Sequence, residues 1–566
     1  MFSDPVVGDD FFGRQEIIDL LIKRASALKS GYRQNVAIIG HQQLGKTSIL
    51  RHFLHLYNDP QTLSIYVEIK LQAVDYFVEQ FTRSLLFQYL SRASKVDPTE
   101  TLAGLSEKAV VSIPKTVARI EEIACLLKSR RAEEAYSRLF DLTSSVKQET
   151  GLNCIVILDE FHRLGEFGIK NAFSDFGKKI MVQKDTMYLL SSSAFSASRK
   201  ILAEKLALLF GNFERIYLKV FDFETSFRFL EKRLGPLGIP DLLKSFVVAF
   251  TDGHPFFLEN VASRLREIGL SKNESEVSRQ TLAEALQKLL YESQGVLNQY
   301  FMKLVSPWTQ SSSRGTQLLI LTEMAKGKNK LKEISAAINR SQREISREIQ
   351  ELMAHELILK TGVFYRFHNK IFKFWLREVY EKKELSLLGT SAKAEDFLSR
   401  IQTGIDEHEA ISRMALGDRV LKLFRLFNND IVEFGEKKRR LPHFTEFIRT
   451  SGAAKRLSDA ESGRIIAKGH GRCWLCQIVE EKASEREILD LVEHGEKNAP
   501  QATTRVLVAL RGLDDNAKLL AKEKRILTLG LSRINMLMDI YGKVPIIHPA
   551  SKEKPLEHVG ACKASA

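Results

Sequence analysis

A glycine-rich segment near the N-terminus has the residue types that bind nucleotide phosphates. It fits the pattern G-x-x-x-x-G-K-[ST] at every defined position, and its residues are Gly40, His41, Gln42, Gln43, Leu44, Gly45, Lys46, Thr47 and Ser48. Glycines let backbone N–H groups curl around phosphate oxygens, and the start of the following helix adds partial positive charge. We expect Lys46 to reach the β- and γ-phosphates and Thr47 to ligate Mg²⁺. The segment therefore predicts ATP and Mg²⁺ as cofactors.

Two adjacent acids, Asp159 and Glu160, follow a wholly apolar stretch at residues 154–158. A carboxylate at the end of such a strand can hold hydrated Mg²⁺, which is the role we expect for Asp159. The next acid can orient and deprotonate an attacking water, so Glu160 is the candidate catalytic base beside Lys46. The serines at 191–193 offer a hydroxyl to the γ-phosphate or the water, or form a plain polar turn. The acidic pair predicts ATP hydrolysis.

These motifs need a scaffold that brings distant segments together. Short apolar stretches alternate with helical patterns, beginning with an amphipathic helix at 15–28, and the predicted strands are 35–39, 64–69, 154–158, 187–191 and 215–218. Strands that alternate with helices predict a parallel sheet covered on both faces. The fold class that we expect is an α/β P-loop NTPase.

The rest of the chain divides into further predicted domains. Residues 222–305 are helical throughout and form a lid after an NTPase core at 1–221. A polar linker precedes residues 312–383, whose pattern of helices and a short hairpin predicts a winged helix. Residues 397–566 have their own strands and helices and form an α+β C-terminal domain.

Together these motifs resemble the archaeal-type ATPases of the STAND branch of AAA+-like P-loop NTPases. The stretch at 11–16 is similar to the N-terminal box of that group, and the resemblance implies that this box, which includes Arg14, packs near the adenine. The stretch at 253–258 is similar to the G-x-P motif of the helical lid. The resemblance implies that Pro255 touches the base and that His254 approaches the phosphates. The chain departs from the group at Gly211-Asn212, where Gly-Arg is frequent, so no γ-phosphate-sensing arginine is assigned.

The sequence leaves two interpretations of what the winged helix contacts. On DNA its third helix enters the major groove, with an exposed N-terminal end made of Ser341, Gln342, Arg343, Ser346 and Arg347. Lys326, Lys328 and Lys330 are then candidates for phosphate contacts. Alternatively the winged helix packs on the nucleotide domain and regulates it. The negative charges of Glu344, Glu348 and Glu351 on the same third helix disfavour contact with DNA phosphates.

The C-terminal region resembles the nuclease-like tail of some archaeal ATPases, a degenerate PD-(D/E)xK fold. An active nuclease needs an Asp where this chain has Gly463 or Arg464, so we expect no nuclease activity. The Glu-x-Lys position corresponds either to Glu480 and Lys482 or to Gln477 and Val479. A lone C-x-x-C at 473–476 is expected to be buried and structural. The basic run at 437–440 binds phosphate or forms a solvated turn.

The length, cysteine content and charge of the chain indicate what class of protein it is. A length of 566 residues suggests three or four domains, and no apolar run approaches the roughly 20 residues of a membrane helix. The start of the chain lacks signal-peptide character, and its five cysteines form no disulfide framework, so we expect a cytoplasmic protein without membrane partners. Residues 311–566 carry +11 of the net charge of +14, which suggests a polyanion partner or a solvated Lys-rich surface.

Three functions remain open from the sequence. The first is an ATP-driven switch whose ATP and ADP states alter a winged helix that contacts double-stranded DNA. The second is a signalling or scaffold NTPase, with the winged helix as an internal regulator and with protein partners or self-association. The third is an origin-initiator-like DNA-binding ATPase, which has the same order of domains.

Overall fold

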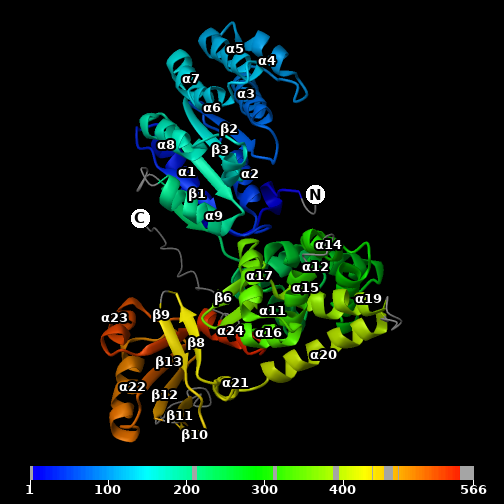
Figure 1. Cartoon of the computed structure of the whole chain (residues 1–566), viewed down its shortest axis with the longest axis vertical. Coiled ribbons are helices and arrows are strands. Elements are labelled where there is room, and N and C mark those ends of the chain that lie inside the picture. The colour runs from blue at the N-terminus through cyan, green and yellow to red at the C-terminus, as the bar shows by residue number, and fades with distance from the viewer. Residues whose placement is uncertain are drawn as a thin grey trace, which may run out of the picture. The chain divides into compact units, whose positions relative to one another are not determined.

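The computed structural model describes residues 4–206, 213–309, 315–386, 394–435, 437–451, 463–469 and 471–547. The chain divides into two compact units, Met1–Val220 and Phe221–Ala566, and each has its own core (Figure 1). The sequence predicts a polar linker over 306–315, but residues 306–309 continue a helix and Trp308 is buried, so the start of this prediction is wrong. Residues 310–314 and the Gly211-Asn212 position lie outside the described residues. No helix in the described part of the chain has both the length and the apolarity that crossing a membrane needs.

The first unit is built on a five-stranded sheet whose strands are all parallel. The strands are β1 (Asn35–Ile39), β2 (Thr62–Glu68), β3 (Asn153–Asp159), β4 (Thr186–Ser192) and β5 (Phe213–Tyr217). All of the predicted strands are therefore present. Their spatial order is β2-β3-β4-β1-β5, so β4 lies between the strand that ends at Asp159 and the strand that leads into the glycine-rich loop.

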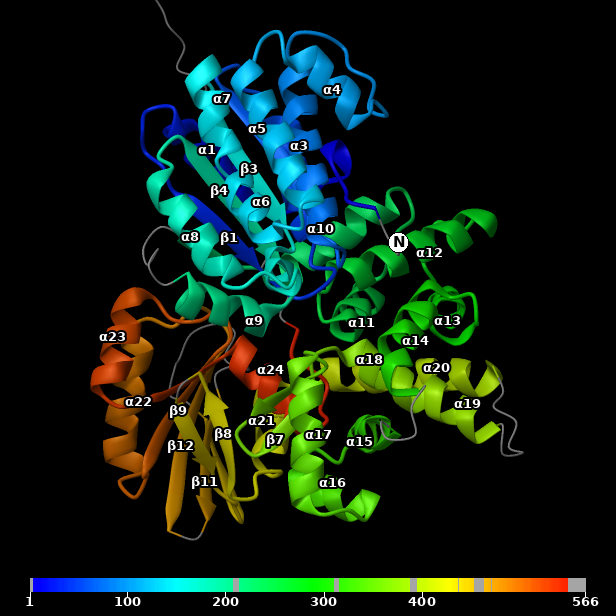
Figure 2. The ribbon, with the colours of Figure 1, turned by 45° about the horizontal axis from the view of Figure 1, so that its top comes forward.

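Helices cover both faces of this sheet, as predicted (Figure 2). Val36 and Ile38 face a layer made by α1 (Gln15–Leu28) and α2 (Lys46–Leu56). Ala37 and Ile39 point to the opposite face, where the core is larger and is made by six helices. These are α3 (Val74–Leu90), α4 (Leu102–Ala109), α5 (Pro114–Lys128), α6 (Ala132–Leu139), α7 (Leu142–Thr150) and α8 (Ala172–Val182). A further helix, α9 (Phe195–Lys200), follows β4. This is the P-loop NTPase architecture that the sequence predicts.

The second unit begins with a helical region, as expected. Its helices are α10 (Phe223–Leu234), α11 (Asp241–Thr251), α12 (Pro255–Ser271), α13 (Arg279–Leu286) and α14 (Val296–Thr309). The winged-helix arrangement follows, with α15 (Gly315–Ala325), α16 (Leu331–Ile338) and α17 (Gln342–Ala354) ahead of a hairpin of β6 (Ile358–Thr361) and β7 (Phe364–Phe367). Two short helices, α18 (Lys370–Trp375) and α19 (Glu381–Ser386), lead away from it.

The C-terminal region is an α+β assembly. It contains α20 (Ala394–Ser412), α21 (Leu416–Phe424), a separate hairpin of β8 (Asp430–Phe434) and β9 (Lys437–Leu441), and the helices α22 (Glu485–Asn498), α23 (Asp515–Glu523) and α24 (Leu531–Ile540). Its mixed sheet has the order β10 (Glu446–Ser451), β11 (Gly463–Gly469), β12 (Arg472–Val479), β13 (Thr504–Ala509) and β14 (Leu527–Gly530). The basic run at 437–440 forms strand β9, so the alternative of a solvated turn is wrong.

The two cysteines of the C-x-x-C stretch lie on β12 and are buried, as predicted. Because side chains alternate along a strand, residues three apart point to opposite faces of the sheet. Cys473 packs into the core under α22 and α23, whereas Cys476 packs into the core that contains Trp474 and α24. The pair therefore belongs to two different cores.

Candidate nucleotide site

The backbone of the glycine-rich loop has the conformation that the motif requires. Gln43 and Gly45 have positive φ values of 61° and 88°, and α2 begins directly after Gly45. A Cβ at Gly40 would lie 2.9 Å from Leu218 Cβ and 3.1 Å from the Leu218 carbonyl oxygen. Only glycine fits this close approach between the end of β1 and the segment after β5. The loop is therefore a preformed cradle at the N-terminus of α2.

Lys46 and Thr47 are oriented toward this cradle and toward the acidic strand. The Lys46 side chain is 5% exposed, and its Nζ donates to the His41 carbonyl oxygen at 2.8 Å, so the lysine spans the loop. Thr47 Oγ1 donates to Asp159 Oδ2 at 2.7 Å. Two predicted Mg²⁺ ligands that are 112 residues apart in the chain are thus direct neighbours.

Asp159 is buried and surrounded by hydroxyl donors. Tyr66 Oη donates to Asp159 Oδ2 at 3.0 Å, and Ser191 Oγ donates to Oδ1. Burial and the negative charge of Asp159 both raise the pKa of Tyr66, so its hydroxyl remains protonated and remains a donor. A carboxylate beside a threonine hydroxyl is a hard oxygen set, which fits Mg²⁺.

Glu160 is held in place by the neighbouring strand. Its backbone has the left-handed φ of 58°, which turns the side chain away from the line of β3. Glu160 Oε2 accepts hydrogen bonds from the Ser193 backbone N–H and from Ser193 Oγ, each at 2.8 Å. Ser191 at the end of β4 and Ser193 directly after it therefore contact the two acids, a role that the sequence did not identify.

His162 is a further polar group beside Glu160 that the sequence analysis missed. Its Nδ1 lies 2.8 Å from Ser192 Oγ and 3.4 Å from Glu160 Oε2, and Ser198 Oγ donates to Ser192 Oγ at 2.6 Å. Burial lowers the pKa of His162, and Glu160 raises it by a smaller amount. The imidazole is therefore neutral near pH 7. In the sequence, only its position two residues after Glu160 indicated that His162 lies near the site.

The N-terminal box docks on the helix that follows the P-loop. Phe11 stacks on His52 with ring centroids 4.1 Å apart, and the Val6 N–H donates to Ser48 Oγ at 3.1 Å. Arg14 has a left-handed φ of 63°, and its guanidinium donates to the Lys219 carbonyl oxygen. Arg14 thus joins this segment to the chain just after β5. Its contact with a nucleotide stays a prediction.

The predicted lid residues open helix α12 of the second unit. His254 is the N-cap residue and Pro255 is the first residue of the helix, where a proline needs no N–H partner. The His254 ring lies 4.5 Å from the Phe257 ring. Gly253 has a φ of 69°, and a Cβ there would lie 2.3 Å from the Phe221 carbonyl oxygen. Only glycine fits this turn. The contact of His254 and Pro255 with a nucleotide stays a prediction.

The predicted DNA-facing end of the winged helix is largely exposed. Gln342, Arg343 and Arg347 are exposed on α17, and Ser346 is half-buried. Ser341 caps the helix, because its Oγ accepts from the Glu344 N–H at 3.3 Å while Glu344 Oε2 accepts from both the Ser341 N–H and its hydroxyl. The Ser341 hydroxyl is thus engaged in capping.

The wing itself is packed against the C-terminal region. Val363 N–H donates to the Ile431 carbonyl oxygen at 2.9 Å, and a Cβ at Gly362 would lie 2.0 Å from that oxygen. Phe364 belongs to the core of the C-terminal sheet. Lys330 pairs with Asp430 at 2.8 Å, and Lys326 pairs with Glu323 and Glu381 at 2.9 and 2.6 Å. Two lysines predicted to contact DNA phosphates are therefore neutralised by the chain's own acids.

The nuclease-like position holds a polar cluster centred on Arg464. Arg464 on β11 pairs in register with Gln477 on β12, and its guanidinium donates to Asp490 and lies 3.1 Å from His494 Nδ1. Glu480 and Lys482 lie beyond the end of β12. No group of three or more His, Cys, Asp or Glu side chains among the described residues is arranged to hold a metal ion.

The comparison with protein families bears on the first unit. Residues 10–170 match the family model of the AAA ATPase domain, a range that includes the P-loop and both acids. This part of the chain is similar to the AAA ATPase domain. The comparison with curated proteins gives no match.

The chain is also similar to solved structures at low sequence identity. A Walker-type ATPase of Pyrococcus abyssi is 16% identical, with a TM-score of 0.45, and the match covers 66% of this chain and 99% of that one. The ORC2 protein of Aeropyrum pernix, in ADPNP–ADP complexes, is 12% identical with a TM-score of 0.43, covering 72% and 98%. The ORC1 protein of Aeropyrum pernix in complex with DNA is 14% identical with a TM-score of 0.39, covering 68% and 97%.

Proposed function

We propose that the AAA ATPase domain binds ATP with Mg²⁺ and hydrolyses it, and that the chain is a molecular switch driven by this cycle. The observation that carries the proposal is the 2.7 Å contact of Thr47 Oγ1 with Asp159 Oδ2 beside a preformed phosphate cradle. The hydroxyl and the carboxylate are the oxygen ligands that Mg²⁺ prefers. The AAA ATPase family match over these residues supports the same activity.

Each residue of the site has a distinct role in this proposal. The N–H groups of the P-loop and Lys46 bind the phosphates, and Thr47 and Asp159 hold the metal. Mg²⁺ bound there neutralises phosphate charge. Glu160 takes a proton from the attacking water, for which its carboxylate has to be available rather than bound to Ser193. The structure thus describes the acid in a restrained position, which suits a switch with slow turnover.

We further propose that the nucleotide state alters how the winged helix contacts double-stranded DNA. Two observations support this. Arg343 and Arg347 are exposed at the N-terminal end of α17, the end that reads base edges in winged-helix and related proteins. The half of the chain that contains them carries most of the net positive charge.

A second candidate function is a scaffold NTPase whose winged helix is an internal regulator. The packing of the wing on β8 favours it, because a wing occupied by the chain itself is not available to DNA. In this alternative the partners are proteins or other copies of the chain.

Duplex DNA binding in different nucleotide states separates the two candidates. The switch predicts affinities that differ by at least about fivefold between ADP and a non-hydrolysable ATP analogue. It also predicts that Arg343→Ala with Arg347→Ala weakens binding. Equal affinities in both states, with no effect of the double variant, would reject the DNA switch and favour the scaffold.

A further inference from the structure

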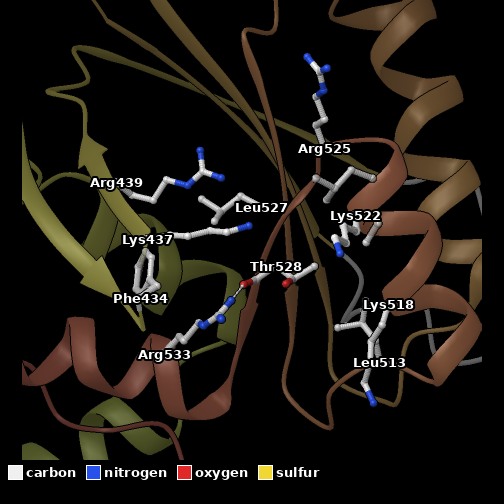
Figure 3. Close-up of a pocket in the computed structure, with 12 residues that line it drawn as sticks. Phe434, Lys437, Arg439, Leu513, Lys518, Lys522, Arg525, Leu527, Thr528 and Arg533 are labelled. Atoms are coloured by element: carbon white, nitrogen blue, oxygen red, sulfur yellow. Dashed lines mark hydrogen bonds between the residues drawn. The ribbon is translucent and has the colours of Figure 1, made fainter.

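A basic cavity lies in the C-terminal region, and its lining shares no residue with the candidate nucleotide site or with the nuclease-like position. It has a volume of about 620 Å³ and is lined by β9, α23, β14 and the start of α24 (Figure 3). Six cationic side chains line it, namely Lys437, Arg439, Lys518, Lys522, Arg525 and Arg533. None of its lining residues is acidic. Figure 3 shows Lys437 and Arg439 on one wall and Lys518 and Lys522 on the opposite wall, with β14 between them.

Most of these cations form no ion pair with an acid in the part of the chain that the structure describes. Among the described residues, no carboxylate lies within 4.0 Å of Lys437, Arg439, Lys522 or Arg525, whereas Lys518 pairs with Asp515 at 2.8 Å. Other basic side chains of this region are neutralised, such as Lys438 by Glu433 at 3.7 Å and Arg464 by Asp490. Like charges in one cavity repel each other, so the cluster costs stability unless an anion joins it.

The lining favours a phosphate backbone over a base or a small nucleotide. Phe434 is the aromatic residue of the cavity, and the Arg533 guanidinium lies over its ring at 5.6 Å, so that face is not free to stack on a base. The lining has no Asn or Gln to pair with adenine and no Asp or Glu to pair with cytosine. Six cations around one cavity are typical of contacts to nucleic-acid phosphates, which fix position without reading sequence.

The segments beside the cavity indicate why this region, and not the wing, would contact the phosphates. The wing of the winged helix is occupied by the Ile431 segment, and Lys330 is paired with Asp430. The hairpin β8–β9 that receives the wing on one strand presents Lys437 and Arg439 to the cavity from the other strand. The region that covers the wing therefore supplies a basic surface of its own.

We propose that this cavity binds the phosphate backbone of a nucleic acid without reading its sequence. This binding rests on the proposed contact of the chain with nucleic acid, and it places backbone contacts in the C-terminal region in addition to those of α17.

The test measures the affinity of the full chain for a labelled duplex of about 30 base pairs across about 50 to 200 mM salt. The cavity variant is Lys437→Ala with Arg439→Ala. Its matched control is Lys438→Ala with Arg440→Ala, which removes the same charge from the same strand, and all four side chains are exposed. A second pair compares Lys522→Ala, in the cavity, with Lys524→Ala, outside its lining.

The cavity variant is expected to bind the duplex on the order of tenfold more weakly. The slope of log affinity against log salt concentration is expected to become shallower by about 2, because each lost phosphate contact removes about one unit. The controls are expected to keep the wild-type slope. Equal losses in the cavity variant and its control would overturn the proposal in favour of general charge attraction. Absence of duplex binding by the wild type at about 50 mM salt would also overturn it.

Two further arms identify the source of the phosphate. In the first, inorganic tripolyphosphate is tested in place of the duplex. If tripolyphosphate binds in the cavity of the wild type and the duplex does not bind there, the cavity is a site for a small polyanion and the proposal is overturned. Loss of duplex binding in Arg343→Ala with Arg347→Ala, but not in the cavity variants, would place the contacts on α17 alone. ATP turnover measured on the same proteins reports the proposed ATPase separately, so its failure is distinguishable from failure of the cavity.

Discussion

Ser193 donates both its backbone N–H and its hydroxyl to Glu160 Oε2, each at 2.8 Å. Glu160 follows β3, whereas Ser193 follows β4, the strand between β3 and the P-loop strand. The candidate base is thus restrained by the strand that separates it from the phosphate cradle. A movement of the segment after β4 would change how free this carboxylate is.

Removing one of these two hydrogen bonds is expected to speed hydrolysis. Ser193→Ala deletes the hydroxyl donor, and hydrogen bonds to charged groups contribute about 1.5–3 kcal/mol. Because the carboxylate is then less restrained, we expect kcat to rise several-fold with little change in KM, as measured by steady-state ATP hydrolysis.

Ser193→Thr is the control for this change, because it keeps a hydroxyl at the same position. It is expected to hydrolyse ATP at about the wild-type rate. A fall in kcat for Ser193→Ala would show instead that Ser193 positions Glu160 for the reaction, and the restraint would be rejected.

The packing of the wing gives a prediction about stability. Gly362 and Gly435 both have positive φ, at 69° and 65°, and both lie in hairpin turns. A Cβ at Gly362 meets the Ile431 carbonyl oxygen at 2.0 Å, whereas a Cβ at Gly435 meets nothing within 4 Å. Gly435→Ala should cost about 1–2 kcal/mol for the left-handed backbone alone. Gly362→Ala should cost at least twice that.

Chemical denaturation of the two variants measures the difference. Equal costs for Gly362→Ala and Gly435→Ala would mean that the contact between the wing and the β8 strand contributes nothing to folding. The internal-regulator alternative would then lose its supporting observation.

A buried histidine in the second unit predicts a pH dependence of stability. His408 is 3% exposed and lies 2.9 Å from Ser245 Oγ, and burial together with the nearby Arg419 lowers its pKa to about 4. The unfolded chain binds the proton near pH 6.5, so it holds more protons than the folded chain below that pH. The stability is therefore complete above about pH 6.5 and falls by about 2 kcal/mol by about pH 5.

Denaturant titrations at about pH 7 and about pH 5 measure this loss, with His408→Gln as the comparison because glutamine does not titrate. The variant is expected to lose less stability than the wild type over this range. The same loss in both proteins would contradict the assignment to His408.

The local motifs were predictable from the sequence because they are encoded by adjacent residues. The P-loop at 40–48, the acids after β3 and the helix over 15–28 all follow from spacing within one short segment. The parallel sheet follows from the alternation of strands and helices. That alternation does not specify that β4 lies between β1 and β3.

Contacts between distant segments were not predictable in the same way. The hydrogen bonds of Ser191 and Ser193 to Asp159 and Glu160 depend on two strands being neighbours, which one sequence does not reveal. The wing was predicted as a hairpin, but its burial depends on the Ile431 segment, which lies some seventy residues later in the chain and has no matching pattern. Ion pairs such as that of Lys330 with Asp430 likewise appear only once the fold is known.

The most direct test of the central claim is ATP binding and turnover by Lys46→Ala and Glu160→Gln beside the wild type. The proposed site predicts that Lys46→Ala does not bind ATP, because the cation that reaches the phosphates is gone. It predicts that Glu160→Gln binds ATP like the wild type, while turnover falls by at least about 100-fold. Hydrolysis at the wild-type rate by Glu160→Gln would contradict the claim that Glu160 is the catalytic base.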